Sequence, residues 1–83
     1  MKNETIKAIG LELSDIRRSK GISLLQVATD MQLNKDTLSK YENGNSSMKI
    51  YILDNLLNYY HINIDIFFKN VYDRLQNECL QQK

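Results

Sequence analysis

The chain has a single cysteine, no proline and no long hydrophobic run, and each absence narrows what it can be. Because Cys79 is alone, an intrachain disulfide and a multi-cysteine metal site are both excluded, and a reducing compartment is favoured. No run of about 18 apolar residues is present, so a membrane-spanning helix is not expected. Residues 1–7 also lack the apolar core of a signal peptide. We therefore expect a cytoplasmic protein with no membrane partner.

The net charge is also small, because 11 basic residues are nearly balanced by 10 acidic ones and leave a formal charge of +1. A slight basic excess lies between Ser14 and Lys49. Any binding to nucleic acid should therefore depend on a few placed contacts and not on a broad basic surface. The hydrophobic fraction of 42% and the charged fraction of 25% are typical of a folded globular protein. With 83 residues the chain has room for one domain, residues 1–83, with a modest core.

The hydrophobic pattern predicts an all-α fold of five helices. No strand-like alternation, linker or internal repeat is present. In the first helix, apolar residues at steps of three and four form one stripe that ends before Gly21. The first expected helix begins after Asn3, and the second and third cover about residues 24–31 and 35–43. The fourth follows a cap at Ser46 or Ser47 and ends at about residue 60, and the fifth covers about residues 64–80. Their expected inward residues include Ile6, Ile9, Leu13 and Ile16 in the first, Leu38 and Tyr41 in the third, Ile50, Leu53, Leu57 and Tyr60 in the fourth, and Ile64, Phe67 and Val71 in the fifth.

Helix-start signals are strongest between Ser23 and Gly44. Ser23 precedes an apolar pair and has Gln26 three residues on, which is a capping-box pattern. Asn34 is a second cap, and Gly44 is a C-terminal stop. Pairs of apolar residues flank each start at the spacing of a hydrophobic staple: Ile22 with Val27, Leu33 with Leu38, and Ile62 with Phe67. Two short capped helices separated by a tight turn are thus predicted.

These residues resemble the Cro and repressor type of helix-turn-helix domain, also called the XRE family. The resemblance covers about residues 6–68. It depends on the combination of Arg17, the Gly21-Ile22-Ser23 entry, Ala28, the turn at Gln32-Leu33-Asn34, Thr37-Leu38-Ser39 and Glu42-Asn43-Gly44. The family's fold is a compact five-helix, lambda-repressor-like domain, and its members are DNA-binding regulators of bacteria and phages. A restriction-modification controller protein and a repressor of a phage or mobile element both fit.

The resemblance implies that the third helix enters the major groove while the second braces it. By matching positions, the residues that face base edges would be Lys35, Asp36, Thr37, Ser39 and Lys40. Lysine can donate to guanine and aspartate can accept from cytosine. Phosphate contacts would come from the flanking groups Arg18, Asn34, Asn43, Asn45, Ser46, Ser47 and Lys49. A solvated helix face and a solvated turn are the structural alternatives for these residues.

The resemblance also implies an ion pair between Arg17 and Glu42 that ties the first helix to the end of the third. Three departures from the family pattern stand out: Leu24 replaces a glutamine that touches phosphate, Gln32 replaces the turn glycine, and Met48 replaces a proline. Leu24 matters most, because it removes a polar DNA contact. It indicates lower affinity, a different approach to the DNA, or another partner in place of DNA.

The fifth helix is more apolar than one buried stripe requires. A second stripe runs along Phe68, Tyr72, Leu75 and Cys79. A small domain has no second core to cover it, so we expect a homodimer, unless both stripes fold into one wide core. The rival function is a protein-binding module of the same fold, an antitoxin or antirepressor acting through this helix. A protein antagonist is a possible further partner.

Catalysis is the remotest class for this sequence. His61 has no partner at a useful spacing, Cys79 has no nearby base, and no nucleophile motif is present. We expect no catalytic residue, cofactor, metal ion or small-molecule ligand.

Overall fold

The structure is a computed structural model that describes residues 4–81, with side chains through residue 77. Five helices follow one another: α1 (Glu4–Ser19), α2 (Leu24–Asp30), α3 (Lys35–Asn43), α4 (Ile50–Tyr60) and α5 (Ile64–Gln81). No strand occurs among residues 4–81. The all-α prediction is confirmed, and the helix bounds agree with the expected ones to within a few residues. The predicted Asn3 cap lies outside the described residues.

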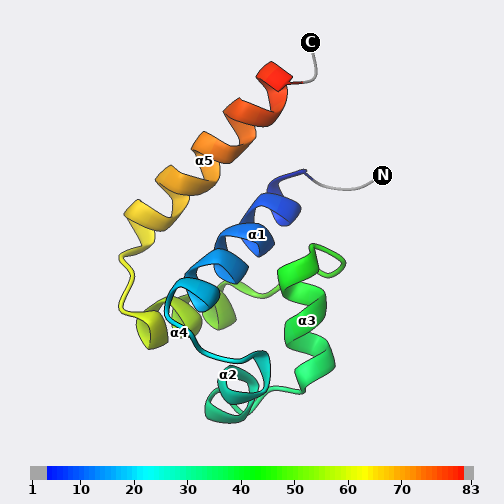
Figure 1. Ribbon diagram of the computed structural model, residues 1–83, viewed down its shortest axis with the longest axis vertical. Helices are drawn as coiled ribbons and strands as arrows, with labels where there is room; N and C mark the ends of the chain where they lie inside the picture. Colours follow the sequence, from blue (N-terminus) through cyan, green and yellow to red (C-terminus); the bar gives the residue numbers. More distant parts are fainter. Residues whose placement is uncertain (1–3, 82–83) are drawn as a thin grey trace.

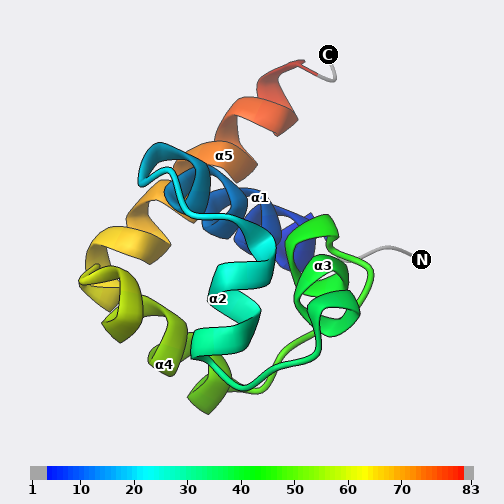
Figure 2. The same cartoon turned by 60° about the horizontal axis from the view of Figure 1, so that its bottom comes forward.

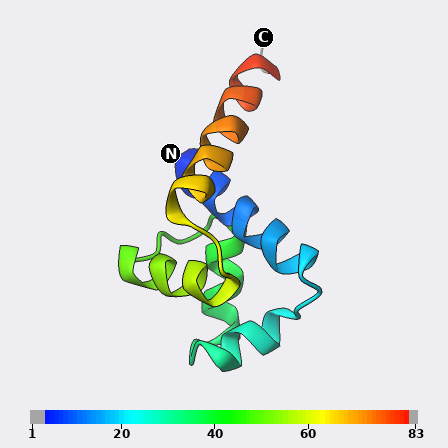
Figure 3. The same ribbon diagram turned by 90° about the vertical axis from the view of Figure 1, so that its left-hand side faces the viewer.

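Helix α1 lies in the middle of the fold, with α5 along one side and α3 along the other (Figure 1). Helices α2, α3 and α4 group at one end, and the C-terminal part of α5 extends away from them (Figures 2 and 3). The stripe predicted for α1 explains this position, because Leu13 and Ile16 are buried and Ile9 packs against the core. The largest fully buried side chains come from all five helices: Leu13, Val27, Leu38, Leu56, Leu57, Tyr60 and Phe67.

Three expectations are wrong, one about a helix cap and two about helix faces. Helix α4 begins after Lys49, which makes no side-chain capping bond, so neither Ser46 nor Ser47 caps it. Ile50 is 66% exposed because, as the first residue of α4, it precedes the turn that reaches the core. Ile64 is likewise exposed at the first position of α5. Helical periodicity places residues on a face but does not show where the neighbouring helix ends.

The second stripe of α5 is divided between core and solvent. Phe68 and Leu75 pack against the core, whereas Tyr72 remains exposed. Phe68 also lines a shallow apolar pocket of about 130 Å³, together with Ile9 and other residues of α1, α3, α4 and the α3–α4 loop. The side chain of Cys79 lies outside the described residues. The wide-core alternative therefore explains Phe68 and Leu75, whereas Tyr72 is the described residue of the stripe that remains exposed.

A buried carboxylate joins α1 to α5. Glu12 accepts from Arg74 Nε at 2.9 Å and from Asn70 Nδ2 at 3.1 Å, and its side chain is largely buried. Arg74 also pairs with Asp15 at the surface. A buried carboxylate is strongly destabilising unless its oxygens are paired. The polar bonds therefore fix the position of α5 on α1 in addition to the apolar contacts of Phe67 and Val71.

Within residues 4–81, no helix combines the length and apolar character needed to cross a membrane. Among residues 4–77, whose side chains the structure describes, no cluster of three or more His, Cys, Asp or Glu is suited to a metal ion.

Candidate nucleic-acid interface

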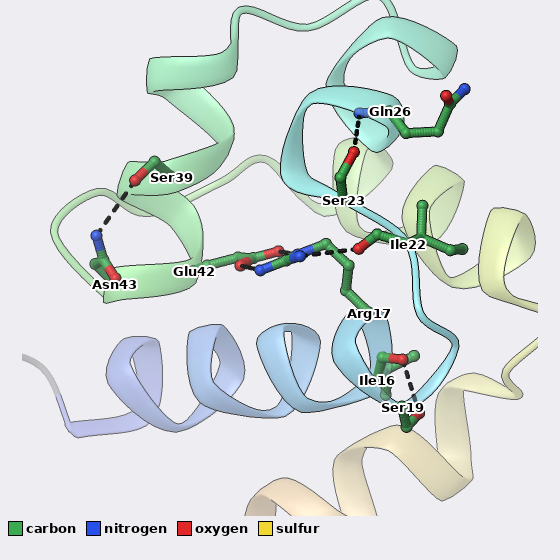
Figure 4. Close-up of polar contacts among 9 residues, drawn as sticks. All are labelled: Ile16, Arg17, Ser19, Ile22, Ser23, Gln26, Ser39, Glu42 and Asn43. Atoms are coloured by element: carbon green, nitrogen blue, oxygen red, sulfur yellow. Dashed lines mark hydrogen bonds and ion pairs between the residues drawn. The ribbon is translucent and has the colours of Figure 1, made fainter.

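Side-chain caps begin both short helices, as the sequence predicts. Ser23 Oγ accepts from the Gln26 amide at 3.0 Å, and Asn34 Oδ1 accepts from the Asp36 amide at 2.8 Å (Figure 4 shows the first bond). The Gln26 side chain bonds to Asp30 one turn later, so it does not complete a reciprocal capping box. Each cap satisfies an amide that the helix itself leaves unpaired, which fixes where α2 and α3 begin.

The turn between α2 and α3 is closed by backbone bonds. The Leu33 amide donates to the Ala28 carbonyl at 2.8 Å, and the Gln32 amide donates to Thr29. Gln32 has a φ of 57°, in the left-handed region that disfavours residues with a Cβ. The usual glycine of this turn would adopt that conformation without strain. The departure noted in the sequence therefore places backbone strain in the turn that sets the α2–α3 angle.

Gln32→Gly is expected to stabilise the chain by up to about 1 kcal/mol, because relief of left-handed strain exceeds the added flexibility of the unfolded chain. Urea unfolding followed by circular dichroism measures this. Gln32→Ala is the matched control, because it keeps the strained Cβ and should give no gain. A loss of stability in Gln32→Gly would show that the turn is not strained.

Helix α3 has one buried side and one open side. Leu38 and Glu42 are buried, and Tyr41 is half-buried against the core. The predicted base-contacting residues divide by exposure, with Lys35, Asp36 and Lys40 exposed and Thr37 and Ser39 partly buried. Ser39 Oγ accepts a long bond of 3.4 Å from Asn43 Nδ2 (Figure 4). The open side thus presents two amines and a carboxylate, groups that can donate to guanine and accept from cytosine.

Most of the predicted phosphate-contacting residues lie together after α3. Asn43 ends the helix, Gly44 closes it with a φ of 74°, and the loop follows directly. The exposed residues of this segment are Asn43, Asn45, Ser47 and Lys49, and Ser46 is partly buried. Asn34 is exposed at the other end of α3, but its oxygen is engaged as the helix cap. Arg18 is exposed near the end of α1 and is not part of the loop group.

Arg17 and Glu42 form a two-bond ion pair between α1 and α3 (Figure 4). Arg17 Nε lies 2.9 Å from one Glu42 oxygen, and Nη2 lies 3.1 Å from the other. The remaining Nη1 donates to the Ile22 carbonyl at 2.9 Å, so one guanidinium holds α1, α3 and the entry to α2. The bond to Glu42 raises the pKa of Arg17 above its ordinary value. This pairing uses two parallel bonds and is largely buried. It therefore fixes the orientation of α1 relative to α3 and also neutralises both charges.

Tyr60 lies beside this pair, and among the described residues its buried hydroxyl has no hydrogen-bond partner. Burial, followed by the charge of Glu42, raises the pKa of Tyr60 to about 12 from its ordinary value of 10.0. The neutral phenol therefore contributes its full stabilisation below pH 10, and that contribution is lost as the pH rises toward 12.

Tyr60→Phe should consequently be neutral or stabilising by up to about 1 kcal/mol at pH 7, because no described hydrogen bond is lost. Between pH 9 and pH 12, its free energy of unfolding should fall by about 2 kcal/mol less than that of the parent chain. Urea unfolding at each pH measures both effects. Tyr51→Phe, at an exposed position, is the control and should follow the parent. Identical alkaline profiles for the Tyr60 variant and the parent would contradict the assignment.

Leu24 occupies the position where a polar phosphate contact is expected from the resemblance. It is partly buried and packs against the core, while its neighbour Leu25 is 59% exposed. The substitution therefore exchanges a polar group for an apolar packing contact at the start of α2.

Sequence reasoning anticipated the Arg17–Glu42 pair but missed the other residues that hold α1 in place. Gly10 lies where the backbones of α1 and α3 are close together, because a Cβ there would be 2.4 Å from the Tyr41 carbonyl oxygen. The Glu12–Asn70–Arg74 cluster joins helices separated by about 60 positions in the chain. The only local signals were a glycine inside a helical pattern and a carboxylate between apolar positions.

Two capped helices joined by a tight turn, with α3 open on one side, define a helix-turn-helix protein of the DNA-binding regulator class. The model of the family described as Helix-turn-helix matches residues 13–67, which is more than half of the chain. The chain therefore belongs to the helix-turn-helix family, and the resemblance seen in the sequence is confirmed.

Solved structures share the fold at low sequence identity. The clp gene regulator ClgR from Corynebacterium glutamicum matches with a TM-score of 0.89 and 18% identity, over 94% of this chain and 83% of that chain. A mutant of the restriction-modification controller protein C.Esp1396I matches with a TM-score of 0.82 and 17% identity, over 92% of this chain and 96% of that chain. No curated protein sequence matches this chain.

Proposed function

We propose that the chain is a sequence-specific transcriptional regulator that binds a roughly palindromic operator as a homodimer, either as a stand-alone repressor or as a controller protein. The observation that carries the proposal is the two-sided α3. Its inner side is anchored by Leu38 and Glu42, whereas Lys35, Asp36 and Lys40 are exposed on the other side. A helix held rigidly on one side and polar on the other suits readout of a major groove.

The phosphate contacts belong to the same proposal. We assign them to Arg18, Asn34 and the segment Asn43, Asn45, Ser46, Ser47 and Lys49, which flank α3 at its ends. Thr37 and Ser39 complete the base-reading face. Because the net charge is only +1, specific contacts must provide most of the discrimination, and salt sensitivity should be moderate. No catalytic role is proposed for any residue.

Selection of bound sequences from a randomised duplex pool tests this function. Three chains are compared: the parent, the Lys35→Ala/Lys40→Ala double mutant, and Lys49→Ala as the control. The parent should enrich a two-fold symmetric motif, and Lys49→Ala should recover the same motif with weaker binding to every sequence. The double mutant should lose discrimination at particular base pairs by about 1–3 kcal/mol per contact. Equal losses for both variants on specific and random DNA would show that α3 is not the reading helix.

The proposed dimer uses the exposed part of α5, with Tyr72 at its centre and Phe68, Leu75 and Cys79 along the same stripe. Two paired chains would place the two α3 helices on successive major grooves, about 34 Å apart. Tyr72 is 59% exposed, so its substitution should not disturb the folded chain.

Tyr72→Glu is therefore expected to convert a dimer into a monomer without lowering the helix content, because a charge would be buried between the two copies. Sedimentation equilibrium measures the mass. Asn77→Glu, exposed on another side of α5, is the control and should remain dimeric. An unchanged mass for Tyr72→Glu would remove Tyr72 from the interface.

A second candidate function is a protein-binding module of the same fold. The apolar contact of Leu24 in place of a polar one, and the exposed Leu25 beside it, favour this alternative. No enrichment from the duplex pool at low salt, with a folded parent chain, would support it and direct the search to protein partners of α5.

A further inference from the structure

Helix α1 is attached to its two neighbours by different groups on opposite faces. Gly10 and Arg17 are about two turns apart and share the face toward α3. Glu12 and Asp15 lie on the other face, toward α5. Figure 1 shows α1 between these two helices. The position of α3 relative to α5 is therefore set through α1.

On the α3 side the attachment leaves little freedom. Gly10 allows the backbones of α1 and α3 to approach closely, and a Cβ there would also lie 2.7 Å from the Glu42 carbonyl oxygen. The two bonds from Arg17 to Glu42 then fix rotation about that contact. Together these contacts fix the position of α3 on α1.

On the α5 side, apolar contacts alone would tolerate small shifts. Phe67 and Val71 supply buried surface without fixed direction. The Glu12 carboxylate is different, because both of its oxygens are used, one by Arg74 and the other by Asn70. A slide or rotation of α5 would leave a buried charge unpaired, so only one register of α5 on α1 is favourable.

We propose that Arg74, through Glu12, is a positioning residue that sets the distance between the two recognition helices of the dimer, and so the spacing of the operator half-sites. The inference rests on the proposed function, because it requires dimerisation through α5 and base reading by α3. Arg74 would touch no DNA. Its effect is on which spacing is bound, not on which bases are read.

Arg74→Met tests the inference, since methionine keeps most of the aliphatic length and removes the polar bonds. The matched control is Lys69→Met, because Lys69 lies on the same helix and makes only an exposed pair with Asp73, at 3.6 Å. Both variants and the parent are assayed on duplexes that carry the selected half-sites with the spacer shortened or lengthened by one base pair. Thermal unfolding by circular dichroism identifies a variant that fails to fold, and Glu12→Gln, which keeps the side-chain shape, then takes its place.

The parent and Lys69→Met should prefer one spacer by about tenfold over its neighbours, as expected when a one-pair change misplaces a half-site contact. The affinities of Arg74→Met for the three duplexes should lie within about threefold of one another, and the variant should still read the same bases in each half-site. The inference would be overturned if Arg74→Met were folded and dimeric and still preferred the parental spacer as strongly as the parent does. A parent chain that selects no two-fold motif would instead refute the proposed function itself, so the two failures can be distinguished.

Discussion

Glu42→Ala is expected to lower the free energy of unfolding by about 3–5 kcal/mol, the largest effect among the charged positions. The substitution strands the Arg17 guanidinium, whose side chain is only 12% exposed, without its carboxylate. It also releases the bond network that holds α1, α3 and the Ile22 carbonyl together. Chemical denaturation followed by circular dichroism measures the loss.

The double variant Arg17→Met/Glu42→Leu separates a stranded charge from lost packing. Because it removes both charges and fills the space with apolar groups, it should recover much of the stability lost by Glu42→Ala. Asp73→Ala is the control for an exposed pair and should cost less than about 1 kcal/mol. A Glu42 variant no less stable than the Asp73 variant would show that the Arg17–Glu42 pair contributes little.

Gly10→Ala is expected to destabilise the chain by about 3 kcal/mol, although glycine to alanine inside a helix ordinarily stabilises by about 1 kcal/mol. The added methyl would lie 2.4 Å from the Tyr41 carbonyl oxygen, and that atom belongs to the backbone of α3. It cannot rotate aside as a side chain can, so α1 and α3 must separate. Specific DNA binding should weaken with stability, because α3 loses its support.

Gly21→Ala is the matched control for Gly10→Ala. Apart from its two chain neighbours, no residue places an atom within 4 Å of the Cβ it would add, so its cost is only that of a positive φ, about 1–2 kcal/mol. The two variants compared by thermal unfolding therefore separate steric contact from backbone strain. Equal costs, or a gain for Gly10→Ala, would contradict the close approach of α1 and α3.

Local sequence signals predicted most of the α2–α3 unit. Ser23 and Asn34 cap their helices through bonds that span two or three residues, so the information is contained in the chain around them. The same reasoning placed Leu38 inward. It failed at α4, where two serines suggested a cap but the helix begins after Lys49, which makes no side-chain capping bond.

The supports of the candidate interface could not be predicted in the same way. The role of Gly10 depends on the backbone of α3, and the roles of Glu12 and Arg74 depend on each other across most of the chain. The only local sign of Glu12 is its place between two leucines, and nothing local distinguishes Arg74 from Arg18. Arg17 and Glu42 were anticipated only through the family resemblance, not from their spacing.

Two residues with side chains, Gln32 and His61, adopt left-handed backbone conformations at helix junctions, with φ of 57° and 60°. Each costs about 1–2 kcal/mol relative to an unstrained conformation, which is a sizeable share of the stability of a small domain. In a cell, a difference of this size changes the fraction of unfolded chains, and therefore their exposure to proteases, several-fold. These junctions thus link the geometry of two turns to the lifetime of the folded chain.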